Sequence, residues 1–150
     1  MLNLMLFISF LGSWKFILFL NILILLKLKL SKTNLLIIIS SLSNLFIVEP
    51  LKILIKEPRP PNLLETSYSF PSGHAYSAVA FYCLLTYLLY KRYKSKYIQF
   101  IGIFFILLIA YSRLYLGVHY LHDVLAGLFL GIFWLIFCIK YIHVKPNNQV

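Results

Sequence analysis

The chain has 150 residues, of which 61% are hydrophobic and only 12% are charged, and its mean hydropathy is +0.88. A soluble domain is typically about 25% charged, so this composition excludes a water-soluble domain and an intrinsically disordered chain. The net charge of +10 would suit a nucleic-acid-binding protein, but the basic residues sit between long apolar runs. In that setting they act as orientation signals for membrane insertion, and no nucleic acid partner is expected.

Five apolar segments come close to the roughly 20 residues that a helix needs to cross the hydrocarbon core. In chain order, the expected spans are residues 15–30, 33–55, 74–90, 97–111 and 119–141. Residues 1–13 are apolar but brief, and we expect an interfacial helix there, because merging them with the first span would place Lys15 deep in lipid. The predicted fold is all-α: a polytopic transmembrane helix bundle of about five spans plus a short N-terminal interfacial helix. One integral membrane domain would cover residues 1–150.

The loops between these spans alternate between the two sides of the membrane. One side would hold nine basic residues: Lys27, Lys29, Lys32, Lys91, Arg92, Lys94, Lys96, Lys140 and Lys145. The other side would hold five: Lys15, Lys52, Lys56, Arg59 and Arg113. The positive-inside rule therefore places the nine-residue side in the cytoplasm of a plasma membrane protein. The segments around 56–73 and 112–118 would then face outward.

The outward segments carry polar residues that a simple membrane anchor would not need. Lys52 and Arg59 are seven positions apart, so they would point roughly the same way if the helix continued that far. Arginine offers a planar fork that suits phosphate oxygens, and lysine offers a compact point charge. Ser72 and Gly73 precede an expected helix, whose free N-terminal amides favour an anion.

His119 and Asp123 are four positions apart and would share one face of a helix. A carboxylate placed there can hold the imidazole in one tautomer, as a nucleophile or base with an orienting acid requires. The charged residues among the candidate site residues are Lys52, Arg59, Arg113 and Asp123. Their sum of +2 matches a phosphate dianion and would repel a metal ion. Zinc is the disfavoured alternative, with the expected ligands His74, His119, His122 and Asp123.

Three ordered motifs are present between residues 52 and 123. They read Lys52-x6-Arg59-Pro60, then Pro71-Ser72-Gly73-His74, then Ser112-Arg113-x5-His119-x3-Asp123. With the following Val124-Leu125-Ala126-Gly127, they resemble the three-part signature of the type 2 phosphatidic acid phosphatase family, over about residues 12–140. The resemblance implies an all-helical core and hydrolysis of phosphate esters without a metal or other cofactor. Membrane members commonly have six spans, so the first would be reduced here to residues 1–13.

The resemblance also implies a role for each matched residue. His119 would attack phosphorus and form a phosphohistidine, Asp123 would orient His119, and His74 would protonate the leaving oxygen and then activate water. The substrate-binding residues would be Lys52, Arg59, Ser72, Gly73 and Arg113. Taken singly, these residues also suit snorkelling side chains or helix caps, but their joint occurrence favours a functional site.

The expected partner is a membrane lipid that presents its phosphate at headgroup height while its tail stays in the bilayer. A polyprenyl diphosphate such as undecaprenyl diphosphate is favoured over phosphatidic acid and phosphatidylglycerol phosphate, because short loops offer little surface for a large headgroup. The alternatives are a lipid phosphotransferase with the same pocket and a non-catalytic protein that binds lipid phosphates. The oligomeric state is left open.

Three further ionisable residues lie near the expected site. Glu57 is expected to face solvent or Lys56, because an inward carboxylate would repel an anion. His122 has no carboxylate four positions further on, so it is not the expected nucleophile. Glu49 would either pair with Lys52 at a kink or tune its charge.

Overall fold

The computed structural model describes residues 1–27, 32–61 and 64–142, and every regular element within these ranges is a helix. The helices are α1 (Leu2–Leu11), α2 (Trp14–Lys27), α3 (Lys32–Leu42), α4 (Asn44–Ile55), α5 (Gly73–Ala78), the π-helical turn η1 (Val79–Cys83), α6 (Leu84–Tyr93), α7 (Lys96–Tyr115) and α8 (Leu121–Ile142). This confirms the predicted all-α class. Predictions that fall on Lys29, on Lys145 and on the end of the first span near Leu30 lie outside the described residues.

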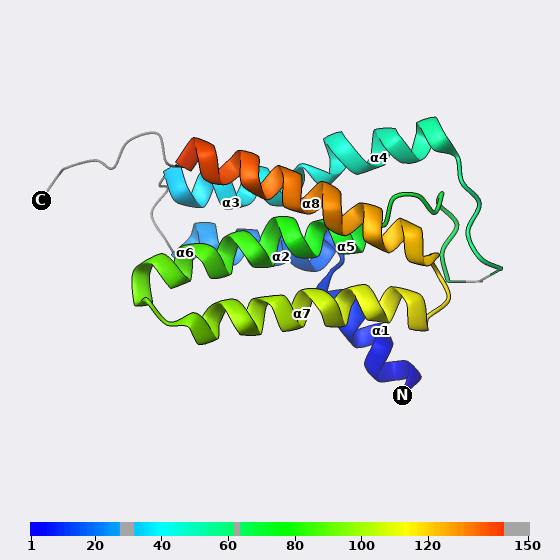
Figure 1. Ribbon diagram of the computed structural model, residues 1–150, viewed down its shortest axis with the longest axis horizontal. Coiled ribbons are helices and arrows are strands. Elements are labelled where there is room, and N and C mark those ends of the chain that lie inside the picture. Colours follow the sequence, from blue (N-terminus) through cyan, green and yellow to red (C-terminus); the bar gives the residue numbers. More distant parts are fainter. Residues whose placement is uncertain (28–31, 62–63, 143–150) are drawn as a thin grey trace, which may run out of the picture.

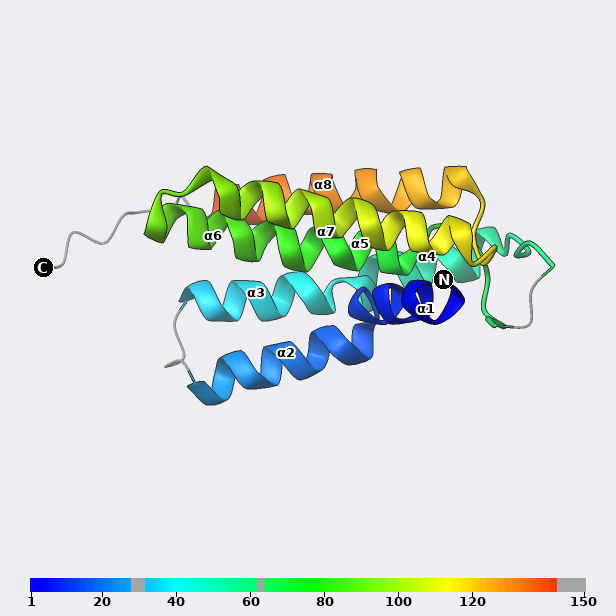
Figure 2. The ribbon, with the colours of Figure 1, turned by 90° about the horizontal axis from the view of Figure 1, so that it is seen from below.

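The helices pack along a common long axis, with α6, α7 and α8 side by side and α2 and α3 on one flank (Figures 1 and 2). The centre is the continuous helix formed by α5, η1 and α6, where Ala75, Tyr76 and Ala78 have no exposed surface. Helix α8 approaches this rod closely through Gly131, where an added Cβ would lie 2.7 Å from the Cβ of Val79. In a membrane the hydrophobic effect does not drive helices together, and small residues at such crossings let the helices pack closely instead.

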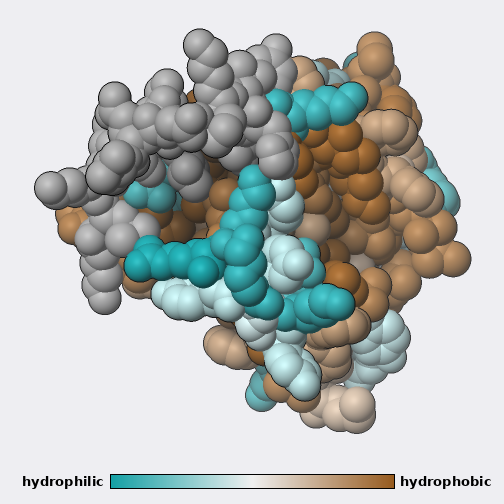
Figure 3. All heavy atoms as spheres, turned by 60° about the vertical axis from the view of Figure 1, so that its left-hand side comes forward, coloured by the Kyte–Doolittle hydropathy of each residue, from teal (hydrophilic) through white to brown (hydrophobic). Residues whose placement is uncertain are grey.

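The outer faces of the bundle are apolar. Phe100 and Phe104 of α7 are 68% and 62% exposed, and Phe133 of α8 is 71% exposed. Hydrophobic residues cover most of the side of the bundle in Figure 3. Contiguous apolar surface of this kind belongs against lipid rather than water, so the fold is that of an integral membrane protein.

Within the described residues, three helical stretches are long and apolar enough to cross a membrane: Asn34–Ile55, Lys96–Tyr115 and Leu121–Lys140. Leu2–Leu11 and Trp14–Leu26 would add a fourth if the pair, bent by 49°, is one broken span. The segment predicted as the third span falls in the helix from Gly73 to Tyr93, which lies alongside α7 and α8 (Figure 1) but is not among these stretches. The number of about five spans therefore stays a prediction.

The N-terminal residues form neither a detached helix nor one long straight helix with the next segment. Helix α1 packs against α7 and buries Met5 and Ile8. The chain bends at Gly12, where an added Cβ would lie 2.5 Å from the side chain of Ile109. The bend leaves Lys15 at the wall of a cavity. The interfacial position of α1 stays a prediction.

Two predicted boundaries are wrong in ways that matter for the site. The fourth span was expected to end at Tyr111, but α7 continues to Tyr115, so Arg113 lies in its last helical turn. The fifth was expected to begin at His119, but α8 begins at Leu121, so His119 lies in the connecting turn. The two ends of the bundle thus differ: the segment after α4 and the α7–α8 turn meet at one end, and the α6–α7 turn lies at the other (Figure 1).

Candidate active site

A cavity of about 530 Å³ opens at the end of the bundle where α4, α5 and α7 meet the segment after α4. Five of the eight predicted site residues line it: Lys52, Arg59, Gly73, His74 and Arg113. The other three, Ser72, His119 and Asp123, are buried and are not among the lining residues. The sequence motifs therefore meet at one site with two layers: the five residues that line the cavity and the three that are buried.

Helix α4 and the segment after it supply two of the cations. Lys52 is only 7% exposed, and its Nζ lies 3.5 Å from Oε1 of Glu49. Glu49 thus pairs with Lys52, which is one of the two alternatives that the sequence left open. The helix ends at Ile55, and Lys56 adopts a left-handed conformation with φ 54°. The condition under which Lys52 and Arg59 would share a helix is therefore not met, and Arg59 reaches the cavity from the segment beyond the helix.

The start of α5 forms the cavity wall as predicted. Ser72 is the N-cap, and its side chain accepts a hydrogen bond from the backbone N–H of Ala75. The backbone N–H of Ser72 donates to the carbonyl of Asp123 over 3.0 Å, which ties α5 to α8. An added Cβ at Gly73 would lie 3.2 Å from Nδ2 of Asn44, so Gly73 leaves no room for a side chain there.

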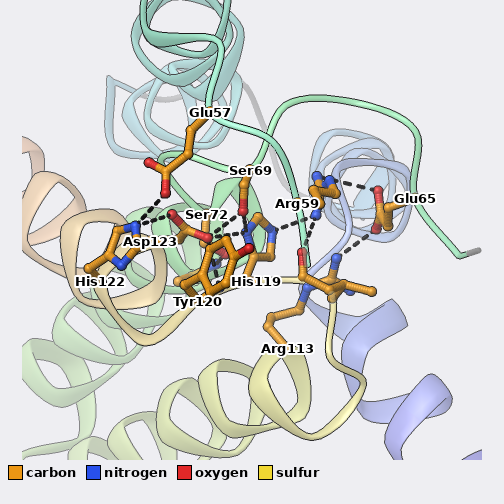
Figure 4. Close-up of polar contacts among 12 residues, drawn as sticks. Glu57, Arg59, Glu65, Ser69, Ser72, Arg113, His119, Tyr120, His122 and Asp123 are labelled. Atoms are coloured by element: carbon orange, nitrogen blue, oxygen red, sulfur yellow. Dashed lines mark hydrogen bonds and ion pairs between the residues drawn. The ribbon is translucent and has the colours of Figure 1, made fainter. Parts of the chain in front are cut away.

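His119 and Asp123 contact each other, although His119 is not on α8. Nδ1 of His119 lies 3.3 Å from Oδ2 of Asp123. The same oxygen accepts a hydrogen bond from the backbone N–H of Tyr120 over 2.8 Å and one from the hydroxyl of Ser69 (Figure 4). The pair is thus built by a capping turn at the start of α8. A spacing of four residues brings two side chains together in this turn, just as it does on one face of a helix.

Arg59 fixes the tautomer of His119. Its Nη1 lies 3.1 Å from Nε2 of His119 and donates to the carbonyl of Val118 over 2.7 Å. A guanidinium has only donors, so Nε2 accepts and the ring proton sits on Nδ1, facing Asp123. The lone pair of Nε2 therefore points toward Arg59, one of the residues expected to bind phosphate.

The electrostatics keep His119 neutral. Burial, with Arg59 acting in the same direction, lowers the pKa of the His119 imidazole from 6.5 to about 2. Burial also lowers the pKa of Arg59, although a guanidinium stays charged in proteins. A neutral imidazole beside a permanent cation is a competent nucleophile at ordinary pH.

Arg113 is 3% exposed and is held from both sides. Its Nη1 donates to the hydroxyl of Ser9, 104 positions earlier on α1, and its Nη2 donates to Oε1 of Glu65 over 2.6 Å. The other carboxylate oxygen of Glu65 lies 3.6 Å from Nη2 of Arg59. Glu65 therefore bridges the two arginines that were expected to hold phosphate.

Sequence reasoning missed Ser9, Glu65 and Ser69. No motif includes them, and only their distance in space to matched residues reveals them. With Lys15, Glu49 and Glu65 included, the site holds four cations and three carboxylates, so its net charge is +1 rather than the predicted +2. A dianion would bind where Glu65 now pairs with Arg59 and Arg113.

Glu57 does not line the cavity, as expected, and its side chain is 27% exposed. Its Oε1 lies 2.6 Å from Nε2 of His122 rather than facing Lys56, because the segment after α4 folds over the start of α8. The donor atoms of Glu57, His122 and Asp123 lie within 4.8 Å of one another. This group contains only two of the four residues named for the zinc alternative.

The fold and this layered site define an all-helical membrane protein with a histidine–aspartate pair behind a basic cavity. Residues 33–146 match the profile of the PAP2 superfamily, and the chain belongs to that family. Over 98 residues it is 40% identical to phosphatidylglycerophosphatase B of Bacillus subtilis (strain 168), covering 60% of this chain and 48% of that one. Over 77 residues it is 43% identical to an undecaprenyl-diphosphatase of Sulfolobus acidocaldarius, covering 50% and 32%.

The structural comparison agrees with the family. The fold matches the crystal structure of the first transmembrane PAP2 type phosphatidylglycerolphosphate phosphatase from Bacillus subtilis with a TM-score of 0.89 and 28% identity. The match covers 99% of this chain and 79% of that one. The sequence matches span about half or less of the curated relatives' own lengths.

Proposed function

We propose that the protein hydrolyses a lipid phosphate or diphosphate through a phosphohistidine on His119, without a metal ion. One observation carries the proposal: His119 lies between the carboxylate of Asp123 at Nδ1 and the guanidinium of Arg59 at Nε2. This arrangement sets both the tautomer and the direction of attack. The family membership and the names of the relatives support the same reaction class.

The first chemical step is attack by the Nε2 lone pair of His119 on phosphorus. The N–P bond forms as the bond from phosphorus to the lipid oxygen breaks, and the proton on His74 passes to that oxygen. Asp123 stabilises the positive charge that develops on the imidazole. In the second step His74 takes a proton from water, the water oxygen bonds to phosphorus, and the N–P bond breaks to regenerate neutral His119.

The cations act by position and charge. Phosphoryl transfer depends on positioning and electrostatic stabilisation more than on covalent help from the protein. Arg59 now donates to Nε2 of His119 and pairs with Glu65. In the reaction it would donate to phosphate oxygens, with Arg113, Lys52 and the amides near Ser72 and Gly73. Substrate binding therefore requires the Glu65 bridge to open.

Two observations point to different lipids within this class. The short connecting segments favour a polyprenyl diphosphate such as undecaprenyl diphosphate, since little chain is available to recognise a large headgroup. The relative with the longer matched region, named phosphatidylglycerophosphatase B, and the matching crystal structure favour phosphatidylglycerol phosphate. The mouth of the cavity would face the outside of a plasma membrane, following the distribution of basic residues.

A panel of lipids tests this proposal. Purified protein in detergent would be given phosphatidylglycerol phosphate, undecaprenyl diphosphate and phosphatidic acid at equal mole fractions, and released phosphate would be measured. We expect kcat/KM for one lipid to exceed the others by about tenfold or more. Phosphate that appears on an added acceptor lipid instead of in water would identify a phosphotransferase. No turnover of any lipid by folded protein would favour a binding protein.

A further inference from the structure

A second polar cluster lies beside the proposed nucleophile, on the opposite side of Asp123 from Arg59 (Figure 4). It consists of Glu57, His122 and Asp123. Neither Glu57 nor His122 lines the cavity, so neither is placed to hold the phosphate. Their contacts run instead to the carboxylate that orients His119.

The two oxygens of the Asp123 carboxylate have unequal surroundings. Oδ2 accepts from the hydroxyl of Ser69 and the backbone N–H of Tyr120, and it faces Nδ1 of His119. Oδ1 is fully buried and accepts no hydrogen bond from the part of the chain that the structure describes. Its polar side-chain contact is Nε2 of His122 at 3.3 Å. A buried carboxylate oxygen without such a contact would be costly.

His122 is fixed although its side chain is 57% exposed. Its Nε2 donates to Oε1 of Glu57 over 2.6 Å. Its ring stacks on Tyr120 with centroids 5.5 Å apart and an angle of 8°, and on Phe70 at 6.1 Å and 28°. The backbone carbonyl of Glu57 also accepts from the N–H of Ser69 over 2.9 Å. Glu57 and Ser69 both belong to the segment after α4. This segment therefore reaches Oδ1 of Asp123 through His122 and Oδ2 through the hydroxyl of Ser69.

We propose that His122, held by Glu57, is a positioning residue for the reaction of His119, acting on the Oδ1 oxygen of Asp123. This inference rests on the proposed function. The terminal torsion of an aspartate is soft, so contacts at Oδ2 alone leave the carboxylate plane free to turn. A contact at Oδ1 fixes that plane and so keeps Oδ2 aligned with Nδ1 of His119. Because His122 and Glu57 lie outside the cavity, their loss would lower kcat and leave KM unchanged.

Four variants isolate this contact. His122→Phe keeps a planar ring for stacking and removes the nitrogen, whereas His122→Gln restores a side-chain N–H. Glu57→Gln weakens the support of His122 while leaving the Asp123 contact in place. Lys56→Gln, at the exposed neighbouring position, is the matched control for a change of charge in the same segment. Each is compared with the unmodified protein by kcat and KM for the preferred lipid.

We expect His122→Phe to lower kcat about tenfold, the order of effect of losing a close polar contact to a buried charged group, with KM within about twofold. His122→Gln should recover most of the loss, Glu57→Gln should lower kcat about threefold, and Lys56→Gln should change neither value. Unchanged kcat in His122→Phe, or a rise in KM without a fall in kcat, would overturn the inference.

A double-mutant comparison separates positioning from a general structural role. In an Asp123→Asn background, His122→Phe should cause little further loss, because the contact acts only through the Asp123 carboxylate. A full additional loss in that background would overturn the inference. If His119→Ala is inactive while His122→Phe keeps full kcat, the inference alone fails. If His119→Ala retains turnover, the proposed function itself fails.

Discussion

The reactivity of His119 depends on which nitrogen carries the proton. Arg59 can only donate to Nε2, and Asp123 can only accept from Nδ1 while it is ionised. Both neighbours therefore favour the same tautomer, so in the proposed reaction the attacking lone pair is oriented before a substrate arrives. Pre-organisation of this kind lowers the barrier to reaction because no proton has to move first.

Asp123→Asn tests this arrangement. The asparagine amide can donate to Nδ1 of His119 and move the ring proton to Nε2, so we expect kcat to fall about 10³- to 10⁴-fold. Steady-state phosphate release on the preferred lipid measures the fall. A loss of less than about tenfold would mean that Asp123 does not set the tautomer.

The pH dependence follows from the lowered pKa of His119. With a folded pKa of about 2 rather than 6.5, the imidazole does not take up a proton as the pH falls through 6.5 and stays reactive into the acid range. Values of kcat/KM would be measured between about pH 4 and about pH 8 and corrected for the ionisation of the lipid phosphate. They should show no fall near pH 6.5 that is due to protonation of His119. An extra acid limb at that pH would contradict the burial of this ring.

The same lowered pKa affects stability in a defined direction. Between the folded pKa of about 2 and the ordinary value of 6.5, His119 binds a proton in the unfolded state and not in the folded state. The contribution of this group therefore makes the fold less stable as the pH falls through that window. At neutral pH the contribution vanishes, because both states are then deprotonated.

Spacing in the sequence predicted the partners that are close along the chain and missed the distant ones. His119 and Asp123 form the expected pair because a short turn brings them together. Ser9 meets Arg113 across 104 positions, and Ser69 meets Asp123 across 54. No local pattern records such contacts, because they depend on how α1 and the segment before α5 pack against the bundle.

At the level of helices, the site depends on close contact between α5 and α8. An added Cβ at Gly127 would collide with the backbone carbonyl of Ser72, and one at Gly131 would lie 3.1 Å from the carbonyl of Tyr76. These two glycines let α8 bring Asp123 to the start of α5. The Val124-Leu125-Ala126-Gly127 run that follows the third motif thus has a packing role.

Gly131→Ala should separate these helices. The added methyl group would meet Val79 at 2.7 Å, and overpacking of this kind typically costs about 1–3 kcal/mol. We expect a lower midpoint of thermal unfolding in detergent and a smaller fall in activity than a change at His119 causes. Ile132→Ala, on the exposed face of the same helix, is the matched control. An unchanged midpoint for Gly131→Ala would show that the contact relaxes freely.

The helix ends were the least predictable elements. Ser112 and Arg113 are polar and suggested a loop, but Ser112 donates to the carbonyl of Ile109 over 2.6 Å and Arg113 is buried against Glu65. Polar residues continue a helix when neighbouring elements supply their partners. The apolar runs predicted the order and approximate positions of the helices, because that pattern depends on the bilayer rather than on tertiary contacts.

At the scale of the whole molecule, the two ends of the bundle carry different chemistry. The cavity lies at one end. The α6–α7 turn, with Lys91, Arg92, Lys94 and Lys96 in and beside it, lies at the other (Figure 1). The positive-inside rule predicts that this turn faces the cytoplasm. The cavity then opens at headgroup height on the outer face, where a lipid can enter without leaving the bilayer.

Single-cysteine labelling in intact cells tests this orientation. In a background without Cys83 and Cys138, Pro61→Cys at the cavity end should react with a membrane-impermeant maleimide. Arg92→Cys should react only after the membrane is permeabilised. Both positions are exposed in the structure, so the comparison reports the side of the membrane. The reverse pattern would place the site in the cytoplasm.

Phosphate release by purified protein in detergent with EDTA, alongside His119→Ala, tests the central claim most directly. We predict that turnover of the preferred lipid persists in EDTA and is abolished in His119→Ala, with the variant still folded by circular dichroism. Loss of turnover in EDTA, restored by added metal, would contradict the metal-independent mechanism and direct attention to Glu57, His122 and Asp123. Substantial turnover by His119→Ala would contradict the assignment of the nucleophile.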